Sequence, residues 1–345
     1  MDSQGTFVAA MIDTTSKAIA GAAALEVMER VGEGEVPGSF DQLRADLEMK
    51  LLQLSETLAV GLPDMFAHEV AWARETYAAR GISPTFLPHC LAGLRSALEE
   101  RLTPDSFQMA AALLERTQAQ LQGDAKAPRD LLAGLRHTEL ARGFLEEALH
   151  GNAATSIQML EQAREDGLTV DQLREEVIAP VQAEIGRMWQ CGEINVAEEH
   201  HCSRVVQEML ARLRERPQAQ VGRSLLAFSV AGDLHEIGSR LVADQFEAAG
   251  WHVIFLGANV PPEDSTRMAA DKKVDLATLS VSQSIHMRAA ARQIAALHAL
   301  DPPVPVLVGG LPFTAIDGLW QAVGADGCAT SATAALHEAN RLLAG

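Results

Sequence analysis

Five short apolar runs in the last third of the chain constrain the fold more than any other feature of the sequence. They occupy residues 224–230, 252–257, 274–282, 304–310 and, more weakly, 327–330. Turn residues bound each run, and helical patterns alternate with the runs. Short apolar strands that alternate with helices are typical of a parallel sheet covered on both faces. Residues 218–345 are therefore predicted to form a doubly wound α/β domain that binds a ligand beyond the carboxyl ends of its strands.

Helical patterns fill the rest of the chain, and its 345 residues predict two or three domains. Four helical segments with short connections, at 128–151, 153–166, 170–191 and 195–215, predict an antiparallel four-helix bundle over residues 128–217. Pro180 is expected to kink the third of these helices. Residues 1–127 are predicted to form a separate helical domain. The predicted fold class is therefore multidomain, α plus α/β.

Charge and cysteine spacing narrow the classes of function. The formal net charge of −18 argues against a nucleic-acid-binding protein, which needs a basic face to neutralise phosphates. The four cysteines are spaced neither as a zinc site nor as a disulfide framework. The N-terminus lacks the order of a signal peptide, and no apolar run approaches the roughly 20 residues of a membrane span. We expect a cytoplasmic protein that binds neither nucleic acid nor a membrane.

The stretch MWQCGEINVAEEHH, residues 188–201, marks the break between the third and fourth bundle helices. Gly192 suits a helix C-terminus, and Asn195 suits an N-cap that Glu198 completes as a capping box.

Glu199 instead lies on an apolar stripe with Cys202, Val206, Met209 and Leu213. A carboxylate on such a stripe needs a partner, because burying it alone is costly. Two explanations stay open at this point, a structural ion pair and a ligand pocket.

The stretch GDLHEIGSRL, residues 232–241, follows the first predicted strand and so lies at the ligand end of the sheet. Asp233 could hold one imidazole nitrogen of His235 and set its tautomer, leaving the other nitrogen free to bind a metal. Gly238 would let another group approach the start of the next helix closely. A structural histidine in a loop is the alternative explanation of this pattern taken alone.

Later residues extend this pattern. Ser280 and Ser282 end the third apolar run, and Gly309 and Gly310 close the fourth. Together with residues 233–238, they resemble the cobalamin-binding signature D-x-H-x-x-G, S-x-L and G-G, with Ser282 where leucine is usual. Residues 248–264 also look like the middle of that domain, so the resemblance covers about residues 221–345.

The resemblance implies a flavodoxin-like, cobalamin-binding domain and gives each residue of the signature a role. His235 would be the lower axial ligand of cobalt, oriented by Asp233. Ser280 and Ser282 would line the slot for the displaced nucleotide tail of the cofactor. Gly309 and Gly310 would leave room for that tail.

The pattern W-x9-EH, formed by Trp189, Glu199 and His200, resembles the capping bundle of CarH-type cobalamin photoreceptors. By this resemblance Trp189 packs over the adenosyl group of adenosylcobalamin, Glu199 hydrogen-bonds its ribose, and His200 supports the pocket. In that family visible light breaks the cobalt–carbon bond, the bundle shifts and the oligomeric state changes. One position departs from the pattern: Gln190 stands where CarH-type proteins carry a histidine that takes the upper cobalt position after light.

The first 127 residues show no helix-turn-helix of the kind that begins CarH-type repressors. A helical domain in that place resembles the photocobilins, photoreceptors that hold biliverdin beside cobalamin. The resemblance makes Trp72, His89 and Cys90 candidate neighbours of a biliverdin. A helical core or a dimer interface is the alternative explanation of the same residues.

The resemblances imply a light sensor that binds adenosylcobalamin and biliverdin and is not an enzyme. Its output would be a light-dependent change of homo-oligomeric state or contact with a downstream protein. Two alternatives stay open: a corrinoid protein that carries a methyl group for a methyltransferase, and a cobalamin sensor that does not respond to light.

Overall fold

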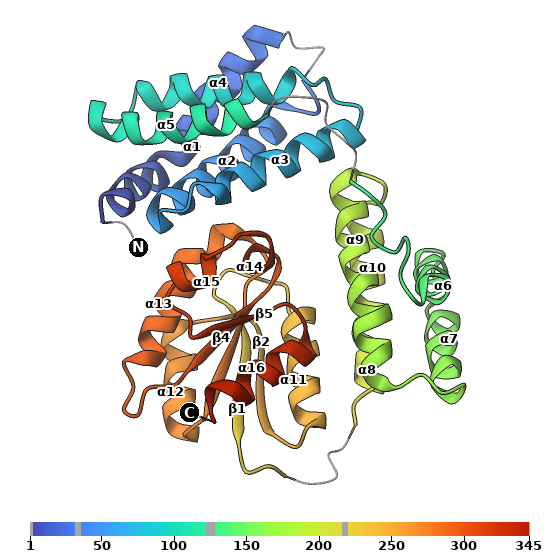
Figure 1. Ribbon diagram of the computed structural model, residues 1–345. Helices are drawn as coiled ribbons and strands as arrows, with labels where there is room; N and C mark the ends of the chain where they lie inside the picture. Colours follow the sequence, from blue (N-terminus) through green and yellow to red (C-terminus); the bar gives the residue numbers. More distant parts are fainter. Residues whose placement is uncertain (1–2, 32–35, 122–127, 216–219, 345) are drawn as a thin grey trace. The chain divides into compact units, whose positions relative to one another are not determined.

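The computed structural model describes residues 3–31, 36–121, 128–215 and 220–344, which form two compact units (Figure 1). The first unit consists of Met1–Ala127, Val281–Ala295 and Gly310–Ala325. The second consists of Pro128–Ser280, Ala296–Gly309 and Asp326–Gly345. The domain boundaries predicted near residues 127 and 217 fall in the stretches 122–127 and 216–219, outside the described residues, and stay predictions.

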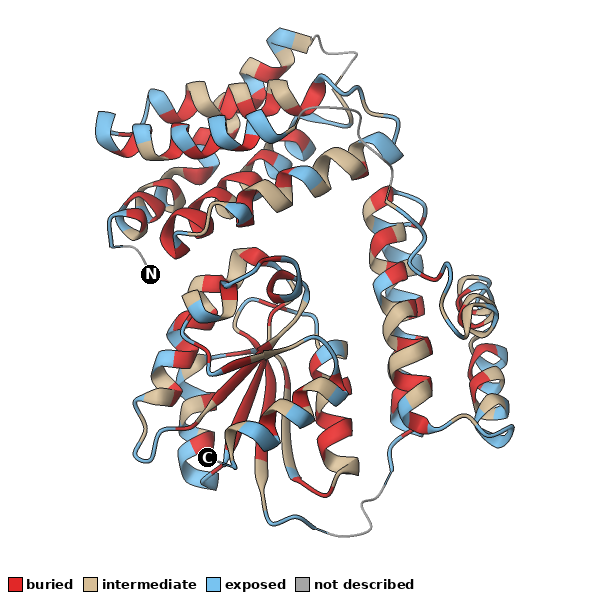
Figure 2. Ribbon diagram, in the orientation of Figure 1, coloured by how far each residue is buried: buried red, intermediate tan, exposed pale blue. Residues whose placement is uncertain are grey.

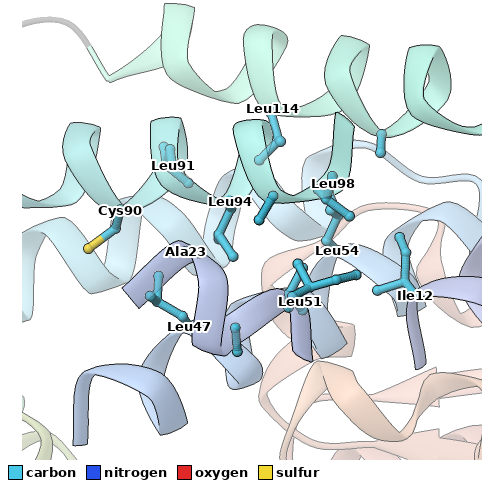
Figure 3. Close-up of a cluster of buried hydrophobic side chains, with 14 of the residues drawn as sticks. Ile12, Ala23, Leu47, Leu51, Leu54, Cys90, Leu91, Leu94, Leu98 and Leu114 are labelled. Atoms are coloured by element: carbon cyan, nitrogen blue, oxygen red, sulfur yellow. The ribbon is translucent and has the colours of Figure 1, made fainter. Parts of the chain in front are cut away.

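The N-terminal part of the first unit is helical, as predicted. It comprises α1 (Ser3–Val31), α2 (Phe40–Val60), α3 (Asp64–Ala79), α4 (Phe86–Glu99) and α5 (Pro104–Gln120). α1 packs against α2 and α4, and leucines of α2, α4 and α5 fill this core (Figure 3). Small residues permit close packing, because a Cβ added at Gly93 in α4 would lie 3.0 Å from the Ala23 carbonyl oxygen in α1.

Two later segments belong to the same unit. One contains η3, a 3-10 turn at Ser284–His286, and the first turns of α13 (Met287–His298). The other contains α14 (Leu311–Ala315) and α15 (Leu319–Ala322). Within this unit η3 contacts α2, so residues just beyond a predicted strand end pack with the N-terminal helices.

The second unit opens with the predicted four-helix bundle. Its helices are α6 (Thr138–Leu149), α7 (Ala153–Glu165), the continuous α8–η2–α9 segment, and α10 (Val196–Arg212). The long third helix combines α8 (Val170–Gln172), a π-helical turn η2 (Leu173–Ile178) and α9 (Ala179–Cys191). The π-helical turn ends two residues before Pro180, which lacks the N–H that a regular helix would use.

The first bundle helix starts at Thr138 rather than at the predicted residue 128. Residues 131–134 and 136–137 form turns, and Gly134 adopts a left-handed conformation with φ of 79°. The Thr138 hydroxyl donates to the carbonyl oxygens of Leu132 and Leu135, at 2.9 and 2.8 Å. These local bonds replace helical ones, which explains why the helical pattern overestimated the length of α6.

A five-stranded parallel sheet follows the bundle, with the order β2-β1-β3-β4-β5 expected of a flavodoxin-like fold. The strands are β1 (Ser224–Val230), β2 (His252–Val260), β3 (Leu276–Ser280), β4 (Val306–Gly309) and β5 (Gly327–Ala329). The inner strands are largely buried, whereas the edge strand β2 is mostly half-exposed (Figure 2). Helices α11 (Ile237–Ala248) and α16 (Ala332–Leu342) pack together on the sheet. The predicted fold class is confirmed.

None of the helices in the described part of the chain is both long and apolar enough to cross a membrane. All four cysteines are described, and all are free thiols.

A buried ion-pair network holds the turn between α9 and α10. The Arg187 guanidinium donates to both carboxylate oxygens of Glu184, at 2.9 and 2.6 Å, and to both of Glu193, at 2.7 and 2.8 Å. Glu184 also accepts a hydrogen bond from the backbone N–H of Leu131 at 2.9 Å. Arg187 and Glu184 are both buried, so each charge depends on the other for compensation.

We predict that Arg187→Ala lowers the free energy of unfolding by about 3 kcal/mol, because it leaves the Glu184 carboxylate buried without its cation. Urea unfolding followed by circular dichroism measures the change. Arg212→Ala is the matched control in the same bundle, since Arg212 forms exposed ion pairs with Glu161 and Glu208. An equal effect of both substitutions would contradict the structural role of the buried network.

Candidate functional site

Four residues align across the sheet where its strands end. Ser229 of β1 pairs in register with Ser280 of β3, Ser280 with Gly309 of β4, and Gly309 with Ala329 of β5. The carboxyl ends of parallel strands meet at one edge, where open α/β sheets bind ligands. The structure therefore places the serine and glycine elements of the sequence signature at neighbouring strand ends.

The loop between β1 and α11 carries Asp233 and His235 at this same edge. Asp233 is 1% exposed, and its Oδ1 accepts from the backbone N–H of His235 at 3.0 Å and from the His235 Nδ1 at 2.7 Å. Since a carboxylate can only accept, Nδ1 carries the proton and Nε2 of the neutral ring keeps its lone pair. The predicted orienting role of Asp233 therefore has the required geometry, and the His235 side chain is 60% exposed.

The surroundings of His235 favour its protonated form. The hydrogen bond that His235 donates to Asp233 raises the pKa of His235, partial burial opposes this effect, and the charges of Asp233 and Glu199 add to it. A proton on Nε2 would occupy the lone pair that a metal needs. Protons therefore compete for this nitrogen up to a higher pH than in a free histidine.

Sequence reasoning missed three residues that hold this loop. The buried Ser229 hydroxyl donates to the His235 carbonyl at 2.7 Å and lies 3.0 Å from the Ser239 hydroxyl, which donates to the Glu236 carbonyl at 2.9 Å. Asn259, with φ of 52°, donates its backbone N–H to the Asp233 carbonyl at 2.9 Å.

The position of Ser229 near the end of an apolar run was the available sequence signal for the first of these residues. The Asn259 side chain completes the support, because its Oδ1 accepts from the backbone N–H of Gly232 at 2.7 Å. No local pattern in the sequence distinguishes Ser239 and Asn259 from ordinary helix and loop residues. Together the three residues hold both sides of the Asp233–Glu236 loop.

Glycine occupies the signature positions 310 and 238 for different physical reasons. A Cβ added at Gly310 would lie 2.0 Å from the Val281 carbonyl oxygen, and its φ of 116° disfavours any side chain. Glycine is therefore required at position 310 by contact with the protein's own backbone. This requirement is separate from the predicted role of Gly310 in leaving room for a ligand. A Cβ at Gly238 would lie 3.7 Å from the Ser280 hydroxyl oxygen, at ordinary contact distance. Glycine at position 238 therefore leaves open a space next to Ser280 that a methyl group would fill.

The bundle residues of the predicted site lie at the turn between α9 and α10. The predicted capping box is present: Asn195 Oδ1 accepts from the N–H groups of Ala197 and Glu198, and Glu198 caps the Asn195 N–H at 2.7 Å. Gly192 ends α9 in the predicted left-handed conformation, with φ of 75°. Trp189, in the last turn of α9, is a large apolar residue with 42% of its surface exposed.

Glu199 lies at the open end of the apolar stripe of α10. The other members of the predicted stripe, Cys202, Val206, Met209 and Leu213, are all buried. Glu199 accepts from the Ser203 hydroxyl at 2.7 Å and contacts the exposed His200 ring through its second oxygen. In the described part of the chain no lysine or arginine forms an ion pair with it. Its partners among the described residues are therefore local and polar.

A direct bond connects the bundle to the loop that carries His235. Gln207 of α10 donates from Nε2 to the Glu236 carboxylate at 3.2 Å, and Glu236 immediately follows His235. The Glu199 charge also acts on His235. The bundle and the histidine loop therefore face each other within the second unit.

The biliverdin candidates occupy different environments in the first unit. Cys90 is fully buried in the leucine core, and burial raises the pKa of its thiol to about 12 (Figure 3). A thiol in that state is a poor nucleophile. Trp72 and His89 are half-buried, on α3 and α4 respectively. Tyr77 of α3 packs on Phe86 of α4, with ring centroids 5.8 Å apart. The alternative explanation, a helical core, accounts for Cys90.

The site suits a cobalt ion held by a macrocycle. Among the residues that the structure describes, no group of three or more His, Cys, Asp or Glu side chains could hold a metal ion. His235 offers one oriented imidazole, which would be enough for a cobalt whose other protein-independent ligands come from a corrin ring. The open space between Gly238 and Ser280 lies in the part of the site where the sequence signature predicts the nucleotide tail.

Comparisons with known proteins agree with this site. Residues 223–340 match a family model described as a B12 binding domain, and residues 140–214 match a second model with the same description. The chain is 25% identical over 213 residues to a dimethylamine corrinoid protein of Methanosarcina barkeri, a match that covers 60% of this chain and 98% of that protein.

Two further relatives match smaller shares of the chain. A corrinoid protein of Desulfitobacterium hafniense is 30% identical over 169 residues, covering 46% of this chain and 76% of that protein. The HTH-type transcriptional repressor CarH of Myxococcus xanthus is 30% identical over 138 residues, covering 39% of this chain and 46% of the repressor. The chain therefore belongs to the family of cobalamin-binding corrinoid proteins, and its cofactor is a cobalamin.

Proposed function

We propose that the protein is a light sensor that holds adenosylcobalamin between its helical bundle and its parallel-sheet domain. The observation that carries the proposal is the pair of unusual residues at the turn between α9 and α10. There an exposed tryptophan, Trp189, ends one helix, and a carboxylate on an apolar stripe, Glu199, begins the next. An apolar ring and a hydrogen-bond acceptor suit an adenosyl group, which has both a flat base and ribose hydroxyls.

Each residue of the site has a proposed task. His235 would hold cobalt through Nε2, while Asp233 holds Nδ1 and so fixes the tautomer. Ser280 and Ser282 line the slot for the nucleotide tail, beside Gly238, Gly309 and Gly310. On the bundle, Trp189 covers the adenosine, Glu199 accepts from the ribose, and His200 orients Glu199.

When bound, adenosylcobalamin supplies a cobalt–carbon bond that visible light breaks. The chain's own contribution is to orient the cofactor, to shield it, and to couple loss of the adenosyl group to a movement of the bundle. Loss of the adenosyl group would remove the ligand of Trp189 and Glu199. Because Gln207 links the same helix to Glu236, a shift of α10 would be transmitted to the loop that carries His235. The proposed output is a change of homo-oligomeric state or of contact with a downstream protein, with no enzymatic turnover.

Biliverdin is proposed as a second chromophore in the N-terminal helical domain. Trp72 and His89, both half-buried, are the candidates for contact with it. Cys90 would contribute as a buried apolar neighbour rather than as a point of covalent attachment, because its thiol stays protonated.

A corrinoid protein that carries a methyl group is the second candidate function. The observation in its favour is that the match to the dimethylamine corrinoid protein covers 98% of that protein. Trp189 and Glu199 argue against a methyl-carrying function, because they would crowd the cofactor face that a methyl donor must reach. The acidic composition still predicts no binding to nucleic acid, although one relative is a transcriptional repressor.

We predict that His235→Ala abolishes the absorption signature of a histidine bound to cobalt without unfolding the protein, because the side chain is 60% exposed. Absorption spectra of the purified, cobalamin-loaded variant measure the ligation, and circular dichroism measures the fold. A spectrum identical to that of the wild type would show that another residue provides the lower ligand.

We predict that Trp189→Ala and Glu199→Gln each weaken the binding of adenosylcobalamin by about tenfold or more and leave that of hydroxocobalamin nearly unchanged. Only adenosylcobalamin presents the adenosyl group that these two side chains would contact. Dark titrations with both cofactors measure the two affinities. Glu198→Gln is the control, because Glu198 caps its own helix. Equal losses for both cofactors would contradict the proposed adenosyl pocket.

The deciding experiment for light sensing is purification in the dark with adenosylcobalamin and biliverdin supplied. Absorption and molar mass are then measured before and after green light. We expect an irreversible spectral change together with a change in oligomeric state, and a far-red band if biliverdin is bound. A preference for methylcobalamin would favour the methyl-carrier function. A response to cobalamin that is indifferent to light would favour a cobalamin sensor.

A further inference from the structure

A short polar segment directly follows the serines of the proposed nucleotide-tail slot. It runs over residues 283–288 and includes η3 and the first residues of α13. Two of its side chains, Ser284 and Arg288, bond to helices of the N-terminal domain within the first unit. The N-terminal partners are Asp13 of α1, Ser55 and Glu56 of α2, and Glu69 of α3, and we call these four residues the socket.

Arg288 makes the densest set of these bonds. Its Nε donates to Glu56 Oε1 at 2.8 Å, its Nη1 to Asp13 Oδ2 at 2.7 Å, and its Nη2 to the Ser55 hydroxyl at 3.2 Å. Its backbone N–H donates to the second oxygen of Glu56 at 2.8 Å. Glu56 therefore binds both the side chain of Arg288 and the first turn of α13, where a carboxylate also meets the positive end of the helix dipole.

The remaining socket residues are held in place by bonds of their own. Ser55 donates to Asp13 Oδ1 at 2.6 Å. Glu69 accepts from the Ser284 hydroxyl at 2.7 Å and, through its other oxygen, from Gln53 Nε2 at 2.8 Å. These bonds orient the socket toward Ser284 and Arg288 rather than toward solvent.

The burial of Glu56 makes it costly to move residues 284–288 away from the socket. Glu56 is only 5% exposed, and burial raises its pKa while the Arg288 charge opposes the shift. Without Arg288, the carboxylates of Asp13 and Glu56 would lie together with no cation between them. The cost of that arrangement resists any displacement of residues 284–288.

The path from the socket to the slot is short. Ser282 lies two residues before Ser284, and the Val281 carbonyl is held against Gly310, where even a Cβ would approach it to 2.0 Å. The stretch between the slot serines and Arg288 is therefore confined at one end by Gly310 and at the other by the socket.

We infer that the N-terminal helical domain is a positioning element for the nucleotide-tail slot, acting through the contact of its socket with Ser284 and Arg288. The inference rests on the proposed slot at Ser280 and Ser282, and it is independent of light. Arg288 touches neither tail nor corrin and acts by fixing the segment that follows Ser282. Because coupling is reciprocal, a bound tail would in turn stabilise the docking of the N-terminal helices.

The test compares a corrinoid with a nucleotide tail and one without it, cyanocobalamin and cobinamide. Affinities are measured in the dark by equilibrium dialysis on the full chain and on the variant Arg288→Gln. We expect Arg288→Gln to weaken cyanocobalamin binding by about fivefold or more, the lower end of usual coupling, and to leave cobinamide binding nearly unchanged. Arg116→Gln is the matched control, since it removes one positive charge from an exposed pair with Asp64.

A second variant covers the case in which Arg288→Gln does not fold. Ser284→Ala removes only the bond to Glu69 and leaves the Arg288 ion pairs intact, so a smaller loss with the same selectivity is expected. Equal losses for both corrinoids, or no loss for either, would overturn the inference while the slot itself stands. A wild-type protein that binds cobinamide as tightly as cyanocobalamin would overturn the slot assignment together with it.

Discussion

The hydrogen bond between the buried Asp233 carboxylate and the His235 imidazole is the interaction on which the rest of the site depends. A carboxylate that is 1% exposed must find donors, and the backbone and ring N–H groups of His235 are its donors. The same bond leaves Nε2 as the nitrogen that would bind cobalt in the proposed site. Ser229, Ser239 and Asn259 then restrain the backbone on both sides of the pair. The histidine is thus oriented before any cofactor arrives.

Polar networks also fix the part of the bundle that contributes to the proposed site. The Arg187 network and the Asn195 capping box fix the turn between α9 and α10, which carries Trp189 and Glu199. The buried stripe of α10 anchors the same helix in the bundle core. These supports fix the positions of the Trp189 ring and the Glu199 carboxylate, as the proposed adenosyl pocket would require.

The sequence alone determined the layers of the fold, and it predicted the loop of Asp233 and His235 that the proposed cofactor site uses. Strand β1 matches its predicted bounds at both ends, because a continuously apolar run between turn residues has few alternatives to a buried strand. The cap at Asn195 and the Asp233–His235 pair were predictable for a related reason, since each depends on residues two or three positions apart. The start of α6 was not, because side-chain bonds from Thr138 compete with the helix there.

Only the tertiary structure decided which distant residues meet. Ser229 with Ser239, Gln207 with Glu236, and Glu56 with Arg288 are separated by between 10 and 232 residues. A polar side chain has the same local pattern whether it points to solvent or to a distant partner, so no periodicity reveals such pairs. Helix and strand patterns report which face of an element is buried, and the packing of those faces selects the polar residues that come together at their edges.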